Sequence, residues 1–229
     1  NAAVIGAVNS GLFAAGQACM SPERFLVPAA SVQDFREALV SAFAEWPQGD
    51  PFSREIRLGL IADGRIVEEV QRQVREAVSA GAKVVHGGQI RELSVAGITM
   101  WELQPTILVG VTSDMDMMQR ETMAPIFPVY GYRTVEEAMT VAEGTRYGLT
   151  ATVFGRGQVY RDAAQRLARS HGLVFQNVDM VAGFEPQHWG SGGFKRSGWI
   201  WEWRDGAFVR REGRRDLSAE WHRIATGAK

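Results

Sequence analysis

The sequence of 229 residues has little cysteine, because Cys19 is the single one. One cysteine excludes an internal disulfide framework and favours a reducing compartment, so a cytoplasmic location is expected. Any thiol chemistry depends on this one residue. The spacing of the four histidines is unlike that of zinc ligands, and no metal is expected. These histidines are His86, His171, His188 and His222.

Long apolar runs and an excess of charge of one sign are also missing. No stretch approaches the roughly 20 apolar residues that span a bilayer, and no basic leader precedes a compact apolar segment. Lys plus Arg number 25 against 26 for Asp plus Glu, which leaves a net charge of -1. The composition therefore argues against a membrane and against nucleic acid as partners. Neither a Rossmann glycine fingerprint nor a Walker loop is complete in the chain.

The hydrophobic pattern alternates between helical and strand-like segments. Helices are predicted over 2–14, 31–46, 63–80, 134–143 and 161–170, and strands over 24–28, 82–86, 98–103, 106–111, 126–132, 149–154 and 173–178. Such alternation predicts an α/β fold with a mostly parallel sheet and helices on both of its faces. We expect a single domain over 1–229, with a core over 1–200 and a divergent C-terminal tail over 201–229.

Local signals refine the predicted helices. Ser31 with Asp34, and Thr134 with Glu137, have the spacing of capping boxes. Asp63 is placed to cap the helix over 63–80. Within that helix an apolar residue recurs every four positions, and this stripe is predicted to be the buried face: Ile66, Val70, Val74 and Val78.

Cys19 follows Gly16 and Gln17 in a predicted loop between a buried helix and a strand. Free backbone N–H groups in such a loop can receive a developing oxyanion, so a thiolate there could attack a carbonyl. A lone cysteine beside Ala18 and Met20 is also commonly a small buried hydrophobe. Local sequence leaves both interpretations open.

Four ordered motifs resemble those of the aldehyde dehydrogenase superfamily. The first is Gly16-Gln17-Ala18-Cys19 with Arg24. The second comprises residues 104–108, Asp114-Met115 and residues 121–126, which are similar to the family's P-T-(V/I)-L, D-M and E-x-F-G-P segments. The third is Tyr147 to Ala151 with Val153-Phe154, and the fourth is Gly192 to Gly198. The chain is thereby identified as similar to the catalytic domain of that family.

The resemblance implies roles for individual residues. Cys19 would be the nucleophile that forms a thiohemiacetal and then a thioester with a small-molecule aldehyde. Glu121 would hold the nicotinamide ribose of NAD or NADP, and Met123 stands where the family usually has a phenylalanine beside the nicotinamide. Ala18 and Met20 would shape the substrate tunnel, as would the loop over 178–184. The glycine segment 192–198 would be structural.

The sequence also departs from the family pattern. Ala124 replaces a glycine, and the family's cofactor domain normally precedes the cysteine, whereas 18 residues precede Cys19 here. We therefore expect a truncated, C-terminal catalytic half whose activity needs a missing or separate cofactor-binding half. The expected partners are further copies of the chain or a chain carrying that half, docked on an exposed apolar surface of residues 2–13.

Two other functional hypotheses stay open at this level. The chain could be a non-catalytic homologue with an assembly or regulatory role, in which Cys19 is a relic. It could also be a weak cysteine esterase, since acyl transfer needs a nucleophile, a base and oxyanion donors but no redox cofactor.

Overall fold

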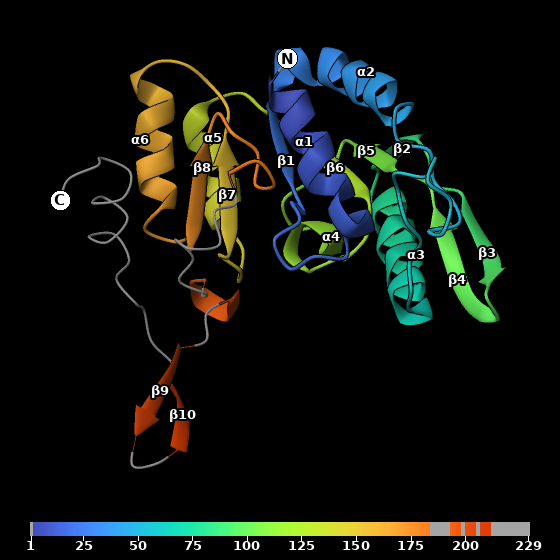
Figure 1. The fold of residues 1–229 in the computed structure, drawn as a ribbon. Helices are drawn as coiled ribbons and strands as arrows, with labels where there is room; N and C mark the ends of the chain where they lie inside the picture. Colours follow the sequence, from blue (N-terminus) through green and yellow to red (C-terminus); the bar gives the residue numbers. More distant parts are fainter. Residues whose placement is uncertain (1, 184–192, 198–199, 205–206, 212–229) are drawn as a thin grey trace. The chain divides into compact units, whose positions relative to one another are not determined.

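The computed structural model describes residues 2–183, 193–197, 200–204 and 207–211 (Figure 1). The chain divides into two compact units, residues 1–138 and residues 139–229, and each unit is described by itself below. The single catalytic-like domain over 1–229 stays a prediction. No helix within the described ranges is long and apolar enough to cross a membrane.

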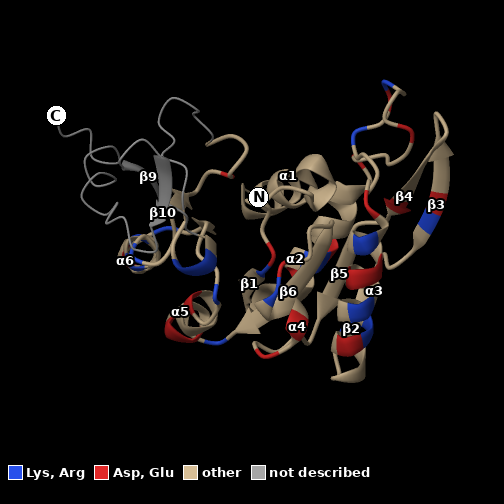
Figure 2. Ribbon diagram, turned by 90° about the horizontal axis from the view of Figure 1, so that it is seen from below, with Lys and Arg blue, Asp and Glu red and all other residues tan. Residues whose placement is uncertain are grey.

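The first unit contains a mixed sheet with helices around it. Its elements are α1 (Ala2–Leu12), η1 (Phe13–Gly16), β1 (Phe25–Pro28), η2 (Ala29–Ser31), α2 (Val32–Phe43), α3 (Gly64–Ser79), β2 (Lys83–His86), β3 (Ile90–Val95), β4 (Ile98–Leu103), β5 (Thr106–Val109), α4 (Asp116–Gln119) and β6 (Ile126–Tyr132). The strand order is β1-β6-β5-β2. β1 and β5 pair with β6 in parallel, while β2 adds an antiparallel edge. Figure 2 shows α1 and α4 on opposite sides of this sheet, and the α/β prediction is confirmed.

The β3–β4 hairpin was only half predicted, because the sequence pattern gave β4 but not β3. Its two strands pair antiparallel from Ile90 with Leu103 to Val95 with Ile98. The connecting residues, Ala96 and Gly97, both have positive φ, of 50° and 80°, as the tight two-residue hairpin turn requires. β3 was missed because its sequence, IRELSV, carries charged residues and has no fully buried position.

Phe127 on β6 is the centre of the first unit's core. Its side chain is 0% exposed and stacks on Phe25 at a centroid distance of 4.7 Å, with Phe43 at 4.9 Å. α1 approaches this ring closely at Gly11, where an added Cβ would lie 2.6 Å from Phe127 Cζ. A glycine is therefore needed for α1 to pack on the sheet.

The predicted buried stripe of α3 is wrong in register. The helix buries Val67, Val70, Gln73 and Ala77, whereas Val78 is 46% exposed. A four-residue repeat advances about 40° per step beyond a full turn, so three steps carry the stripe about 120° around the helix. The buried residues are instead three or four positions apart, which keeps them on one face of the helix. One of these positions is occupied by Gln73, which is therefore buried in the core.

Two of the three helix caps predicted from the sequence are present in the structure. Asp63 accepts a hydrogen bond from Arg65 N at 2.9 Å, and Thr134 Oγ1 accepts one from Glu137 N at 3.1 Å. The box predicted at Ser31 is wrong, because its side chain makes no capping bond. Ser31 ends η2 with helical φ and ψ, so it lacks the extended conformation of a typical N-cap.

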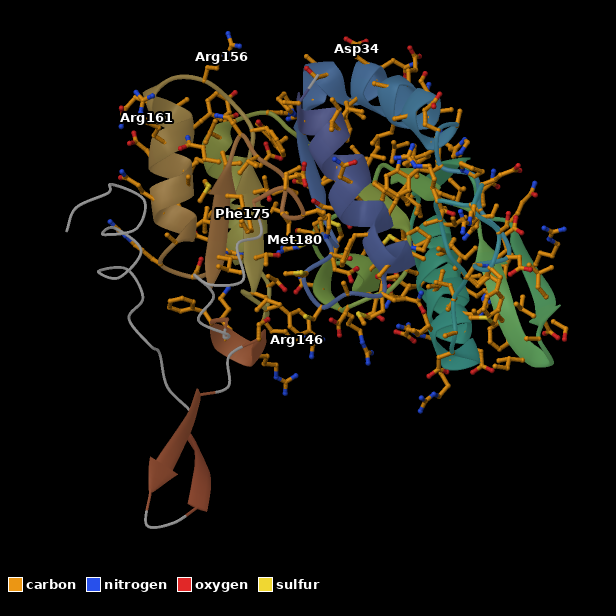
Figure 3. The ribbon with its side chains drawn as sticks, viewed as in Figure 1. Asp34, Arg146, Arg156, Arg161, Phe175 and Met180 are labelled. Carbon is orange, nitrogen blue, oxygen red and sulfur yellow. The ribbon has the colours of Figure 1, made fainter. Side chains whose placement is uncertain are left out.

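The second unit contains α5 (Val135–Glu143), which begins in the first, and then β7 (Thr150–Val153), α6 (Gln158–Leu167), β8 (Leu173–Gln176), η4 (Lys195–Ser197), β9 (Ile200–Arg204) and β10 (Ala207–Arg211). β7 and β8 pair in parallel. β9 and β10 form an antiparallel pair, which begins at the last residue of the predicted core and continues into the predicted divergent tail. Figure 3 shows Phe175 on β8 and Met180 in the segment that follows. The end of this segment packs back on β8, since a Cβ on Gly183 would lie 2.8 Å from the Phe175 ring.

The third and fourth sequence motifs meet in this second unit. Gly148 N donates to Ser197 Oγ at 3.1 Å, and Phe194 N donates to Gly148 O at 2.8 Å. A Cβ on Gly193 would lie 2.8 Å from Gly148 O. The structural role predicted for the glycine segment is confirmed at Gly193, while Gly192 and Gly198 lie outside the described residues.

We expect Phe127→Ala to lower the free energy of unfolding by about 3–5 kcal/mol, because it removes a fully buried ring and leaves a cavity. The matched control is Phe52→Ala, at a side chain that is 79% exposed, where a change within about 0.5 kcal/mol is expected. Urea unfolding followed by circular dichroism measures both. Similar losses for the two variants would contradict this placement of the core.

Candidate functional site

The loop that carries Cys19 is held by the side chain of Gln17. Gln17 Nε2 donates to Ala14 O and Leu60 O, both at 3.1 Å, and Gln17 Oε1 accepts from Ala62 N at 3.1 Å. The segment around Leu60 is itself fixed, because Ile61 and Trp101 exchange two backbone hydrogen bonds. Gln17 therefore ties the start of the loop to the body of the first unit.

Cys19 lies in a tight turn directly after this anchor. Ser21 N donates to Ala18 O at 2.9 Å and closes the turn. Cys19 is exposed, and its neighbours Ala18 and Met20 are half-buried. The interpretation of Cys19 as a small buried hydrophobe is therefore wrong. The predicted nucleophile is accessible to a reagent in solution.

The backbone entering the loop takes an unusual path. Ala14, Ala15 and Gly16 have successive positive φ values of 49°, 56° and 75°. This conformation costs an alanine of the order of 1–2 kcal/mol. Gly16 also meets the opposite segment, since an added Cβ would lie 2.3 Å from the carbonyl carbon of Ala124. The first motif thus packs directly on the second.

Glu23 connects the same two motifs by hydrogen bonds. Its Oε1 accepts from Met123 N at 3.3 Å, and the carboxyl also interacts with the backbone and the hydroxyl of Thr122. Burial of this carboxyl, opposed by those hydrogen bonds, raises the pKa of Glu23 to about 7, since desolvation disfavours the charged form. Burial likewise lowers the pKa of the neighbouring Arg24.

A second polar chain reaches this segment from α3. Gln73 is 0% exposed; its Nε2 donates to Glu121 O at 3.3 Å and to Glu69 Oε1 at 3.0 Å. Its Oε1 accepts from Thr122 Oγ1 at 2.9 Å. Arg72 pairs with Glu69 at 2.6 Å and holds the pKa of that carboxyl near 2. The segment from Glu121 to Met123 is therefore fixed from two sides.

The predicted site residues have these positions in the first unit. Glu121 is exposed and Met123 is half-buried with φ of 56°, so the carboxylate faces solvent while its backbone is fixed. Residues 178–183 belong to the second unit, and Phe184 lies outside the described residues. Across the described ranges no group of three or more His, Cys, Asp or Glu side chains could hold a metal.

Sequence reasoning missed Glu23, Gln73 and Thr122. A signal for Gln73 was present, because it falls between Val70 and Ala77 on the buried face of α3 once the register is correct. A buried amide must find partners, and two of its three partners, Glu121 and Thr122, belong to the second motif. Ser21 has a buried hydroxyl without a hydrogen-bond partner among the described residues.

We expect Gly16→Ala to destabilise the chain more than Gly97→Ala, by about 1–3 kcal/mol. Both glycines have positive φ, so both variants carry the backbone strain, but only Gly16 lies against other backbone, and nothing is within 4 Å of a Cβ on Gly97. Chemical unfolding of the two variants measures the difference. Equal losses would contradict the close packing of Gly16 on Ala124.

Known proteins resemble the chain over most of its length. A relative from Deinococcus radiodurans, "Succinate-semialdehyde dehydrogenase [NADP(+)]", is 34% identical over 185 residues, covering 80% of this chain and 36% of the relative. The mitochondrial succinate-semialdehyde dehydrogenase of Homo sapiens is 34% identical over 203 residues, covering 86% and 35%.

Solved structures give the same result. Succinate-semialdehyde dehydrogenase from Burkholderia pseudomallei aligns with a TM-score of 0.76 at 29% identity, over 86% of this chain and 39% of that one. Glyceraldehyde-3-phosphate dehydrogenase GapN from Methanocaldococcus jannaschii, complexed with NADP, aligns with a TM-score of 0.75 at 28% identity, over 86% and 41%. The chain thus spans little more than a third of the length of these proteins. The model of the aldehyde dehydrogenase family matches residues 1–207, and the chain belongs to that family.

Proposed function

We propose that the chain carries the nucleophile of an enzyme that oxidises an aldehyde to a carboxylate. Cys19 Sγ adds to the carbonyl carbon and forms a thiohemiacetal, loss of hydride from that carbon gives a thioester, and water releases the carboxylate and the free thiol. The observation that supports this most directly is an exposed Cys19 on a turn that lies against the second motif. Gly16 packs on Ala124, and Glu23 accepts a hydrogen bond from Met123 N.

NAD or NADP fits the residues of that segment. A carboxylate accepts hydrogen bonds from vicinal ribose hydroxyls, and the Glu121 side chain is exposed. Met123 offers a half-buried apolar side chain at the neighbouring position, and hydrogen bonds through Gln73 and Glu23 hold the backbone between them. When bound, the nicotinamide supplies the acceptor for the hydride. We propose that Glu121 and Met123 contact the cofactor.

Ala18 and Met20 are proposed to flank the bound aldehyde. Both are half-buried beside the exposed thiol, so each can contact a group held at Cys19 without blocking access to it. A small-molecule aldehyde is the proposed substrate, in a cytoplasmic enzyme. Two relatives are named for succinate semialdehyde, and this compound is therefore a reasonable test substrate.

Turnover is proposed to require a cofactor-binding part beyond the region matched here. The matched region is 36% of the Deinococcus relative and 35% of the human one. Helix α1 is the proposed docking surface for such a part or for a second copy of the chain. It carries no charged residue (Figure 2). Two large apolar side chains are exposed there, Ile5 at 56% and Phe13, just after the helix, at 43%.

We expect iodoacetamide to label Cys19 readily at neutral pH in the folded chain, and prior incubation with succinic semialdehyde to slow the labelling, because the thiohemiacetal occupies the sulfur. Mass spectrometry measures the label, and Cys19→Ser is the control that takes none. Labelling that requires denaturant, or that is unaffected by any small aldehyde, would favour a relic cysteine in a non-catalytic homologue.

Two assays of the chain alone distinguish an aldehyde dehydrogenase that needs a separate cofactor-binding part from a cysteine esterase. With NADP and the aldehyde, the chain alone is expected to produce no reduced cofactor. With an activated ester, it is expected to release one equivalent of alcohol as Cys19 is acylated. Continuous release that Cys19→Ser abolishes would support the esterase, and robust cofactor reduction would contradict the need for another part.

A further inference from the structure

A cavity of about 680 Å³ lies in the first unit, lined by the end of α2, the end of β2 and the base of the β3–β4 hairpin. The described residues that line it do not include Cys19, Glu121 or Met123, so it is separate from the candidate site above. Its volume falls within the range of about 300–1,000 Å³ that is usual for small-molecule pockets. The side chains of its walls indicate which kind of molecule it suits.

The hairpin wall is a ladder of polar side chains. Arg91 is opposite Glu102 in the register of β3 and β4, and their side chains pair at 2.5 Å. One step beyond the end of the strands, Gln104 N donates to Gln89 O at 3.0 Å, which places these two residues opposite each other. Residues two apart on a strand share a face, so the two carboxamides lie beside the ion pair. All four residues line the cavity.

The two glutamine side chains have hydrogen-bonding capacity that the fold does not use. Neither the Gln89 nor the Gln104 carboxamide makes a hydrogen bond with another described residue, and each carries two donors and an acceptor. The His86 ring contacts the Phe43 ring, with 5.7 Å between centroids, and its nitrogens likewise bind no described residue. The polar groups left for a ligand are therefore neutral ones that can both donate and accept.

The other wall is apolar and comes from α2 and the residues after it. Val40, Phe43 and Trp46 line this side. The Phe43 ring is held in the core by Phe127, with 4.9 Å between centroids. The Trp46 indole is held by the Arg57 guanidinium, 4.5 Å from its ring centroid. Contacts within the chain therefore fix both aromatic rings of this wall without a ligand.

The turn that joins β2 to β3 is fixed as well. Gly88 N donates to Thr106 Oγ1 at 2.8 Å, and this hydroxyl donates to Gln104 O at 2.7 Å. A Cβ on Gly87 would lie 2.2 Å from Pro105 O, so the turn packs directly on the chain that follows β4. The backbone beneath both carboxamides is therefore preorganised, which lowers the entropic cost of binding a ligand between them.

These walls suit a flat molecule whose edge both donates and accepts. Arg91 and Glu102 neutralise each other, so the cavity does not select for a net charge. A carboxamide pairs with the amino group and ring nitrogen of adenine, and aromatic side chains stack on bases. We propose that the cavity binds an adenine-type purine nucleoside, with the edge of the base on Gln89 and Gln104 and the ring against the apolar wall. This site goes beyond the function proposed above and does not depend on it.

Calorimetric titration of the full chain with adenosine tests the proposal, and saturable binding of one molecule per chain is expected. Gln104→Leu keeps the size of the side chain but removes the amide, so it is expected to weaken binding about tenfold. The matched control is Gln71→Leu, at an exposed glutamine of α3 that does not line the cavity, where the affinity should be unchanged. No saturable binding at millimolar adenosine, or equal affinities of the two variants, would overturn the proposal.

Purine riboside lacks the amino group of adenosine and tests recognition of the base edge without any variant. The wild type is expected to bind it about tenfold more weakly than adenosine, and the difference should shrink in Gln89→Leu and in Gln104→Leu. If the wild type bound both nucleosides equally, the glutamines would not read the edge and the proposal would fail. AMP is expected to bind as adenosine does, and a much tighter binding of AMP would mean an anion site instead.

The reactivity of Cys19 tests whether the two sites are separate. Adenosine should leave the rate of Cys19 labelling by iodoacetamide unchanged, and Cys19→Ser should bind adenosine as the wild type does, because Cys19 does not line the cavity. Protection of Cys19 by adenosine would place the nucleoside at the thiol and contradict a second site. None of these measurements uses an aldehyde or a nicotinamide, so failure of the proposed enzymatic function would leave their outcome intact.

Discussion

The close contact of Gly16 with the backbone of Ala124 and Pro125 is the constraint on which the candidate site depends. Any side chain at position 16 would overlap the Ala124 carbonyl group, and the positive φ of the same residue turns the chain out of η1. One glycine therefore sets both the direction of the Cys19 loop and its distance from the second motif. Gln17 then fixes the loop on its other side through Leu60 and Ala62.

Hydrogen bonds add to this packing and hold the Cys19 loop and the second motif in place. A buried amide on α3 and a carboxyl beside the Cys19 loop hold the second motif from two sides, because Gln73 accepts from Thr122 Oγ1 and Glu23 accepts from Met123 N. Such a network is stabilising only if every member is satisfied, because each unpaired buried group carries a desolvation penalty. Its members hold backbone rather than substrate. They leave the side chains of Cys19 and Glu121 exposed for chemistry.

The sequence predicted the elements well where local physics decides them. Asp63 and Thr134 cap helices as their residue types suggest, and the parallel strands β1, β5 and β6 follow short apolar runs. The motifs imply a shared site for Cys19 and Glu121. Both residues belong to the first unit, and the shared site itself stays a prediction. What failed needed three-dimensional information. Ser31 does not cap α2, because it is the last residue of η2 and has helical φ and ψ. The role of Glu23 depends on Met123, 100 residues away in the chain.

Spin labelling of the native cysteine tests the central claim most directly. A nitroxide on Cys19, the single thiol of the chain, should strongly broaden the backbone amide signals of residues 121–123 in the folded protein. The broadening should disappear in urea, where about a hundred residues of flexible chain separate the two segments. Amide signals of residues 121–123 with the same intensity in the folded state with and without the label would contradict the account.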